Sequence, residues 1–172
     1  RSRWRKIISH IIMKKIFYII LISLISQYAY SAGSDSSEDS TSNYYSDAKK
    51  LVKQAGKFEK KEKADKAKKL YSQAFKKLEK AYSSDSKNPD ILNYLGYTSR
   101  KVGNFDQAEK FYLKGLSIKP DHNGINEYLG ELYVATNRHN LAIERLEVLS
   151  SCNCKEYDQL KDIIAGKKVS KY

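Results

Sequence analysis

A spacing of 34 residues connects similar positions in the second half of this 172-residue chain. The matching positions are Leu95-Gly96 with Leu129-Gly130, Ala108 with Ala142, and Tyr112 with Leu146. A sequence that repeats every 20 to 50 residues folds as an array of similar units, each burying its apolar face against its neighbours. This repeat constrains the architecture more than any other feature of the chain.

The repeating unit is predicted to be a pair of helices. From Tyr44 onward, apolar residues recur at steps of three and four, without the alternation that is typical of strands. Within residues 89–122 the order is Leu92, Leu95-Gly96, a Gly103-Asn104 turn, Phe105, Ala108, Tyr112, Gly115, Leu116 and Pro120. The sequence therefore predicts an all-α domain in which a turn near residue 103 separates two helices.

This order of residues resembles the tetratricopeptide repeat, in which two antiparallel helices pack large residues against small ones. It departs from the family pattern at Ser99, where an aromatic is usual, and at Gly115, where alanine is usual. The resemblance implies an all-α, antiparallel helix-pair solenoid. About three units and a capping helix are expected, with units at about 44–86, 87–122 and 123–153 and the cap at 154–165.

The first unit is the weakest match and carries an insertion. Ala67 and Ala108 are 41 residues apart, seven more than the period of 34. Seven residues make two helical turns, so the second helix of this unit is predicted to continue through Leu78 and Ala81 to about Tyr82. The alternative is a lysine-rich amphipathic hairpin that is not a repeat.

The N-terminal region has the layout of a bacterial secretory signal. A basic pair after Met13 precedes the apolar run 16–25, and small residues Ala29 and Ser31 precede Ala32. We expect cleavage between Ser31 and Ala32 and a periplasmic mature protein; an uncleaved anchor is the alternative. The remaining assignments are 1–12 as a non-native upstream extension, 13–31 as signal peptide, 32–43 as a flexible leader, 44–165 as the repeat domain and 166–172 as a frayed tail.

The charge of the chain is concentrated in one segment. The formal net charge is +12, but residues 1–31, the upstream extension and the signal peptide together, hold six basic residues and no acid, which leaves +6 for the mature chain. Residues 49–80 contain 13 lysines and four acids. We expect no nucleic-acid partner. The lysines leave open a module that adheres to an anionic envelope surface, although interleaved acids are also typical of a solvated helix.

No residue pattern indicates catalysis. After the signal region only His122 and His139 remain as histidines, and both fall at predicted turns or boundaries. No phosphate loop, nucleophile motif or metal-ligand spacing occurs, so we expect neither an enzyme nor a cofactor nor a metal site. Cys152 and Cys154 are the only cysteines. Three interpretations stay open for them: a disulfide that fixes the turn before the cap, free or metal-touched thiols, and a redox-active pair.

The resemblance implies a concave groove lined by the first helix of each pair, which binds a protein or peptide. Carried over position by position, the groove residues are Lys49, Lys53, Asn93, Tyr97, Arg100, Glu127 and Glu131. An extended segment is expected with its acidic end near Lys49, Lys53 and Arg100. For each residue the alternative is a solvated helix face. Self-association into a homodimer through Tyr44, Tyr45 and Tyr82 is a further possibility.

Overall fold

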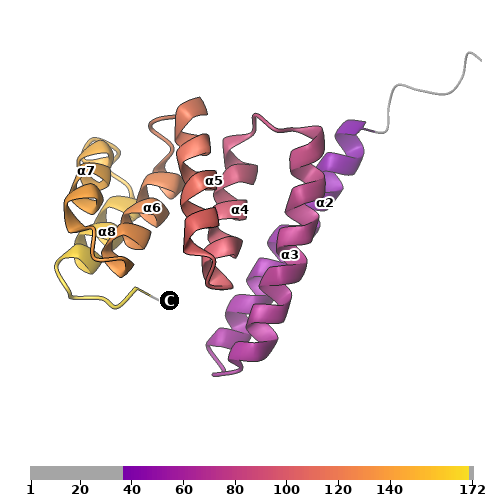
Figure 1. Cartoon of the computed structure of the whole chain (residues 1–172), viewed down its shortest axis with the longest axis horizontal. Helices are drawn as coiled ribbons and strands as arrows, with labels where there is room; N and C mark the ends of the chain where they lie inside the picture. Colours follow the sequence, from indigo (N-terminus) through magenta and orange to yellow (C-terminus); the bar gives the residue numbers. More distant parts are fainter. Residues whose placement is uncertain (1–36, 171–172) are drawn as a thin grey trace, which may run out of the picture. The chain divides into compact units, whose positions relative to one another are not determined.

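Seven α-helices and no strand occupy residues 37–170, the part of the chain that the computed structural model describes (Figure 1). They are α2 (Ser37–Glu59), α3 (Ala64–Ser84), α4 (Pro89–Lys101), α5 (Phe105–Ile118), α6 (Asn123–Ala135), α7 (His139–Leu149) and α8 (Lys155–Ile164). The predicted all-α class is confirmed. The predicted extension 1–12 and signal peptide 13–31 lie outside the described residues.

The helices pair as α2 with α3, α4 with α5 and α6 with α7, and α8 packs on α6 and α7. In Figure 1 the successive pairs lie side by side, from the indigo and magenta hairpin α2–α3 to the yellow helix α8. This is the predicted helix-pair solenoid with a capping helix. None of the helices in residues 37–170 has the length and apolar content needed to span a membrane.

The two glycines of the 34-residue period mark close helix contacts. A Cβ on Gly96 of α4 would lie 2.4 Å from Cε1 of Tyr112 on α5, so only glycine lets this pair approach so closely. A Cβ on Gly130 of α6 would lie 2.5 Å from Cδ2 of Leu160, which belongs to α8. The same sequence position therefore serves contact within the pair in one repeat and docking of the capping helix in the next.

Polar side chains fix where the first helices of the later pairs begin. The Asn88 side chain accepts hydrogen bonds from the backbone N–H groups of Asp90 and Ile91, at the start of α4. His122 Nδ1 accepts a hydrogen bond from Ile125 N, at the start of α6. Such caps satisfy N–H groups that have no partner within the helix. His122 thus has a structural role at the repeat boundary.

The first hairpin is longer than the others, as the seven-residue insertion predicts. Helix α3 has 21 residues and ends at Ser84, whereas α5 has 14. Leu78 and Ala81 in the added turns are fully buried. Helix α2 begins at Ser37, so residues 37–43, predicted as part of a flexible leader, are helical. Once packing fixes the helix after residue 44, each preceding residue gains a hydrogen bond at little further cost.

The end of the chain also differs from the expected frayed tail. The backbone N–H groups of Lys167 and Lys168 donate to Asp162 O at 2.9 and 3.2 Å. Lys168 Nζ forms an ion pair with Asp162 Oδ2 at 2.8 Å. Gly166 allows this reversal because its φ is +69°, in the left-handed region. The residues up to Lys168 therefore fold back onto the end of α8.

Candidate partner-binding face of the first helices

The seven predicted groove residues lie on α2, α4 and α6, and they differ in depth. Lys49 and Lys53 are exposed, and Asn93 and Tyr97 are half-buried. The three charged residues Arg100, Glu127 and Glu131 are buried, with exposed fractions of 1, 4 and 6%. We call these seven positions the first-helix face. Only its α2 and α4 parts present large accessible side chains.

The basic end of the face is formed by α2. Lys49 Nζ lies 4.4 Å from the centroid of the Tyr45 ring, a cation–π arrangement. The Tyr45 ring in turn meets Tyr94 of α4 edge-on at 5.6 Å. Lys53 has no hydrogen bond or ion pair to any residue from 37 to 170. Two ammonium groups are therefore available to an anionic group of a partner.

A row of three tyrosines crosses the helix pairs. The ring centroids of Tyr71 on α3 and Tyr97 on α4 are 5.9 Å apart, and those of Tyr97 and Tyr128 on α6 are 5.1 Å apart. Burial raises the pKa of Tyr97 and of Tyr128, so both hydroxyls stay protonated at neutral pH. Tyr97 in the middle of the row offers a flat, partly exposed ring for contact.

Arg100 is an internal connector between α4 and α6. Its Nη1 donates to Tyr128 O at 2.7 Å, and its Nη2 lies 3.3 Å from Glu131 Oε2. The guanidinium carbon also lies 5.2 Å from the Tyr128 ring centroid. The prediction that Arg100 contacts the acidic end of a partner is therefore corrected, because its side chain is buried and directed at the neighbouring repeat.

Lys101 is a charged residue of this region that sequence reasoning missed. Its Nζ lies 2.6 Å from Glu59 Oε1, and Tyr71 donates a hydrogen bond to Glu59 Oε2 at 2.9 Å. This network ties together α2, α3 and α4. Lys101 follows Tyr97 by four residues, so extending the helical stripe from Asn93 and Tyr97 by one turn would have found it.

Asn93 lies where α4 meets the start of α6. Its Oδ1 is buried and accepts no hydrogen bond within residues 37–170. A Cβ on Gly124 would lie 2.9 Å from Asn93 Nδ2, so the glycine makes room for this amide. The predicted groove residue Asn93 therefore has its amide packed against the start of α6.

Glu127 and Glu131 of α6 form the acidic end of the face, and Glu156 of α8 lies next to them. Burial and the charges of Glu131 and Glu156 raise the pKa of Glu127 to about 8. Glu156, from the first turn of α8, was not among the predicted groove residues. It could have been predicted from its place in the capping helix, because this helix packs against α6 where the first helix of another repeat would pack.

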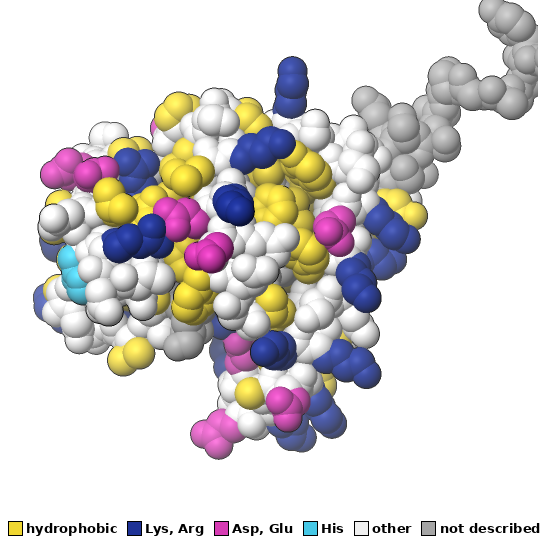
Figure 2. All heavy atoms as spheres, viewed as in Figure 1, with side chains coloured by type: hydrophobic (Ala, Val, Ile, Leu, Met, Phe, Trp, Pro, Cys, Tyr) yellow, Lys and Arg dark blue, Asp and Glu magenta, His cyan; other side chains and the backbone are white. Residues whose placement is uncertain are grey.

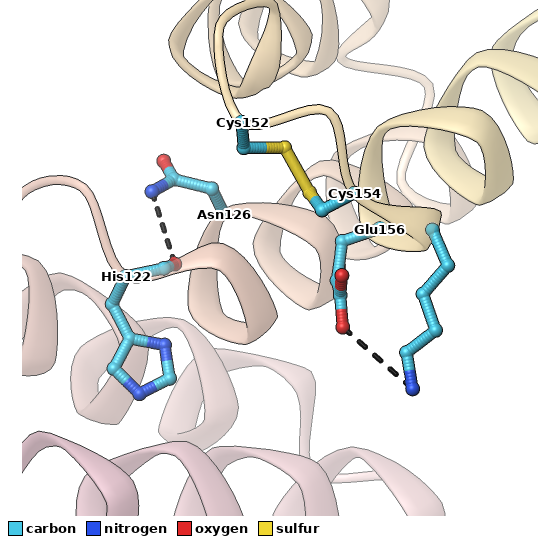
Figure 3. The surroundings of a disulfide bond; sticks show 6 residues. His122, Asn126, Cys152, Cys154 and Glu156 are labelled. Atoms are coloured by element: carbon cyan, nitrogen blue, oxygen red, sulfur yellow. Dashed lines mark hydrogen bonds and ion pairs between the residues drawn. A yellow bond between two sulfur atoms is a disulfide. The ribbon is translucent and has the colours of Figure 1, made fainter.

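Cys152 and Cys154 form a disulfide in the loop between α7 and α8. Figure 3 shows it beside Asn126 of α6, close to Glu156. Asn126 Nδ2 donates to Pro120 O and to His122 O, at 2.9 and 3.1 Å. Residues 37–170 contain no free cysteine and no group of His, Cys, Asp and Glu arranged to hold a metal ion. The disulfide is the first of the three interpretations that the sequence left open.

The tyrosines proposed for self-association are not free surface residues. Tyr44, Tyr45 and Tyr82 are partly buried and pack against the apolar cluster around Leu78. The sequence-based reason for expecting a homodimer is therefore weakened by the packing of these rings.

Residues 89–122, which span α4, α5 and the following loop, match the tetratricopeptide repeat family. The match covers one helix pair, α4 with α5. No curated protein matches the chain. Among solved structures, the TPR domain of Arabidopsis OM64 is 13% identical, with a TM-score of 0.47 over 73% of this chain and 99% of that one.

Two further solved TPR structures are similar to this chain. The first TPR of Spaghetti (RPAP3), bound to the HSP90 peptide SRMEEVD, is 19% identical, with a TM-score of 0.47 over 72% of this chain and 94% of that one. The second TPR domain of human RPAP3, in complex with the HSP70 peptide SGPTIEEVD, is 16% identical, with a TM-score of 0.46 over 71% and 98%.

Proposed function

We propose that this chain is an exported, non-catalytic scaffold that binds an extended segment of another protein across its first-helix face. The tetratricopeptide repeat at 89–122 supports an interaction module. The observation that carries the proposal is the contact between α2 and α4 through the rings of Tyr45 and Tyr94, since α2 bears the exposed Lys49 and Lys53 and α4 bears the half-buried Asn93 and Tyr97. Charge, hydrogen-bond donors and flat apolar area are thereby combined on one face.

Export to the periplasm of a bacterium is part of the proposal. The signal layout of residues 13–31 supports it. The disulfide between Cys152 and Cys154 supports it independently, because structural disulfides persist in oxidising compartments and are rare in the cytosol.

The basic end of the face sets the polarity of the bound segment. Lys49 and Lys53 attract carboxylates, whereas Arg100 of the face pairs with Glu131, and the neighbouring Lys101 pairs with Glu59. An acidic stretch of the partner is therefore expected over α2 and not over α4. Because these lysines are exposed, they act mainly on association rate and specificity, and their effect weakens at raised salt.

The test is cross-linked co-purification from the envelope of the native host, with wild type and with a Lys49→Glu/Lys53→Glu variant. The matched control is Lys69→Glu/Lys76→Glu, which makes the same charge change at exposed positions of α3, the second helix of that pair. A defined protein lost only from the first variant is the expected result. Equal recovery of the same proteins by both variants would remove the first-helix face from consideration.

A second candidate function is adhesion to an anionic surface through the hairpin α2–α3. Figure 2 shows dark blue lysine and arginine side chains gathered over this hairpin, with acidic side chains among them. Part of this charge is neutralised locally, since Asp47 pairs with both Lys50 and Lys77. Binding to anionic phospholipid vesicles that the Lys69→Glu/Lys76→Glu variant loses would favour this candidate.

A further inference from the structure

Glu127 is a buried carboxyl group with no partner of its own. It is 4% exposed, and it makes no hydrogen bond or ion pair to any residue from 37 to 170. The two nearest cations form ion pairs with other acids: Arg100 pairs with Glu131, and Lys155 Nζ lies 3.8 Å from Glu156 Oε1. Buried acids are normally paired or hydrogen-bonded, because taking a carboxylate out of water is costly. This position therefore lacks one positive charge.

A second observation points to the same place. The Tyr112 hydroxyl of α5 is fully buried and has no hydrogen-bond partner in the described residues. Its ionisation is coupled to the charges of Arg100, Glu131 and Glu127, so the hydroxyl lies within the field of this cluster. A buried acid and a buried hydroxyl that act on each other electrostatically thus both lack a hydrogen-bond partner.

We propose that the acidic end of the first-helix face binds a lysine or arginine side chain of the partner segment, with Glu127 as its direct ion-pair partner. This inference rests on the proposed function, and it adds a second specificity element at the opposite end of the face from Lys49 and Lys53. The partner segment would then carry acidic residues over α2 and a basic residue between α6 and α8.

The disulfide lies beside the acidic end of the face. It fixes the loop that leads into α8, and Figure 3 shows Glu156 beside it at the first turn of that helix. Cys154 is the N-cap residue of α8. The bridge therefore restrains the loop that leads to Glu156, whose charge acts on Glu127.

Binding of a cation there releases a proton. The charged and titratable groups around Glu127 are Glu131 and Tyr128 on α6, Arg100 on α4, Tyr112 on α5, and Lys155 and Glu156 on α8. With a pKa of about 8, Glu127 is protonated at pH 7. When an ammonium or guanidinium group arrives, the carboxyl O–H bond breaks, the proton passes to the buffer, and the carboxylate pairs with the cation. Up to one proton is therefore released per segment bound at pH 7.

The test is isothermal titration calorimetry of the protein, expressed from the full chain, at pH 7 in phosphate and in Tris. The probe is a synthetic peptide with three glutamates at one end and three lysines at the other, made in both orders, with a matched peptide carrying glutamine in place of lysine. The difference in binding enthalpy between the two buffers gives the number of protons released.

We expect the lysine peptide to release close to one proton and the glutamine peptide none. Glu127→Gln, which resembles the protonated acid in shape and should fold, is expected to abolish the release and to weaken binding of the lysine peptide about tenfold. The matched control Glu147→Gln, at an exposed position of α7, should leave both unchanged.

Equal binding of the two peptides without proton release would overturn this inference and leave the proposed function standing, since the glutamates would still be held by Lys49 and Lys53. If neither peptide binds in either order, the proposed function fails as well, and the cation subsite with it.

Discussion

Replacing Arg100 with methionine tests the buried connection between α4 and α6. The substitution keeps an apolar side chain of similar length but removes the ion pair to Glu131 and the hydrogen bond to Tyr128 O. Glu131 is then left buried beside Glu127 without its Arg100 partner. Removing one partner of a buried ion pair costs about 3–5 kcal/mol, so we expect the free energy of unfolding to fall by about that amount.

Urea unfolding followed by circular dichroism at the helical band measures this loss. In thermal unfolding the same loss of stability corresponds to a fall in Tm of about 10–15 °C for a domain of this size. The double variant Arg100→Met/Glu131→Met is expected to recover most of the stability, because it removes both charges together. An Arg100→Met variant that loses less than about 1 kcal/mol, or a double variant whose loss equals the sum of the two single losses, would refute the ion-pair reasoning.

Three other predictions concern packing, pH and the disulfide. Gly96→Ala should destabilise the domain by about 1–3 kcal/mol in urea unfolding, because the new Cβ overlaps the rigid Tyr112 ring. The folded pKa of Glu127 lies above its ordinary value of 4.5, so its contribution to stability is fully present below pH 4.5 and is lost as the pH rises through about 8. In parallel thermal scans, Glu127→Gln should therefore have a higher Tm than wild type at pH 8 and nearly the same Tm at pH 4.5. Reduction of the Cys152–Cys154 disulfide should lower the free energy of unfolding by at most about 1.6 kcal/mol, since the bridge closes a loop of only three residues. A larger loss in matched unfolding curves would show that the bridge stabilises structure beyond this loop.

The sequence predicts the fold well because its main signal is a period. The 34-residue spacing fixes which helices pair, and the extra seven residues between Ala67 and Ala108 predict the long α3. The start of α2 was not predicted, because residues 37–43 carry no apolar pattern. They are helical as a continuation of a packed helix, and this depends on contacts that begin at Tyr44.

The sequence predicts which face carries the candidate site, but not how deeply its charged side chains are buried. Carrying residues over from the repeat pattern identifies the face on which Arg100, Glu127 and Glu131 lie, but not how far the next helix covers them. Arg100 and Glu131 are 31 residues apart and meet only because α4 packs beside α6. Glu156 joins them from the capping helix, outside the repeat period. Burial of charge between successive units is a property of the assembled array, and a single unit does not reveal it.

Site-specific photo-cross-linking in the native host tests the central claim most directly. A benzophenone amino acid is placed at Lys53 on the first-helix face, and in a parallel strain at Leu113, an exposed position of α5. The proposed scaffold predicts a discrete cross-linked protein from position 53 and none from position 113. A defined adduct from position 113, with none from position 53, would contradict binding on the first-helix face.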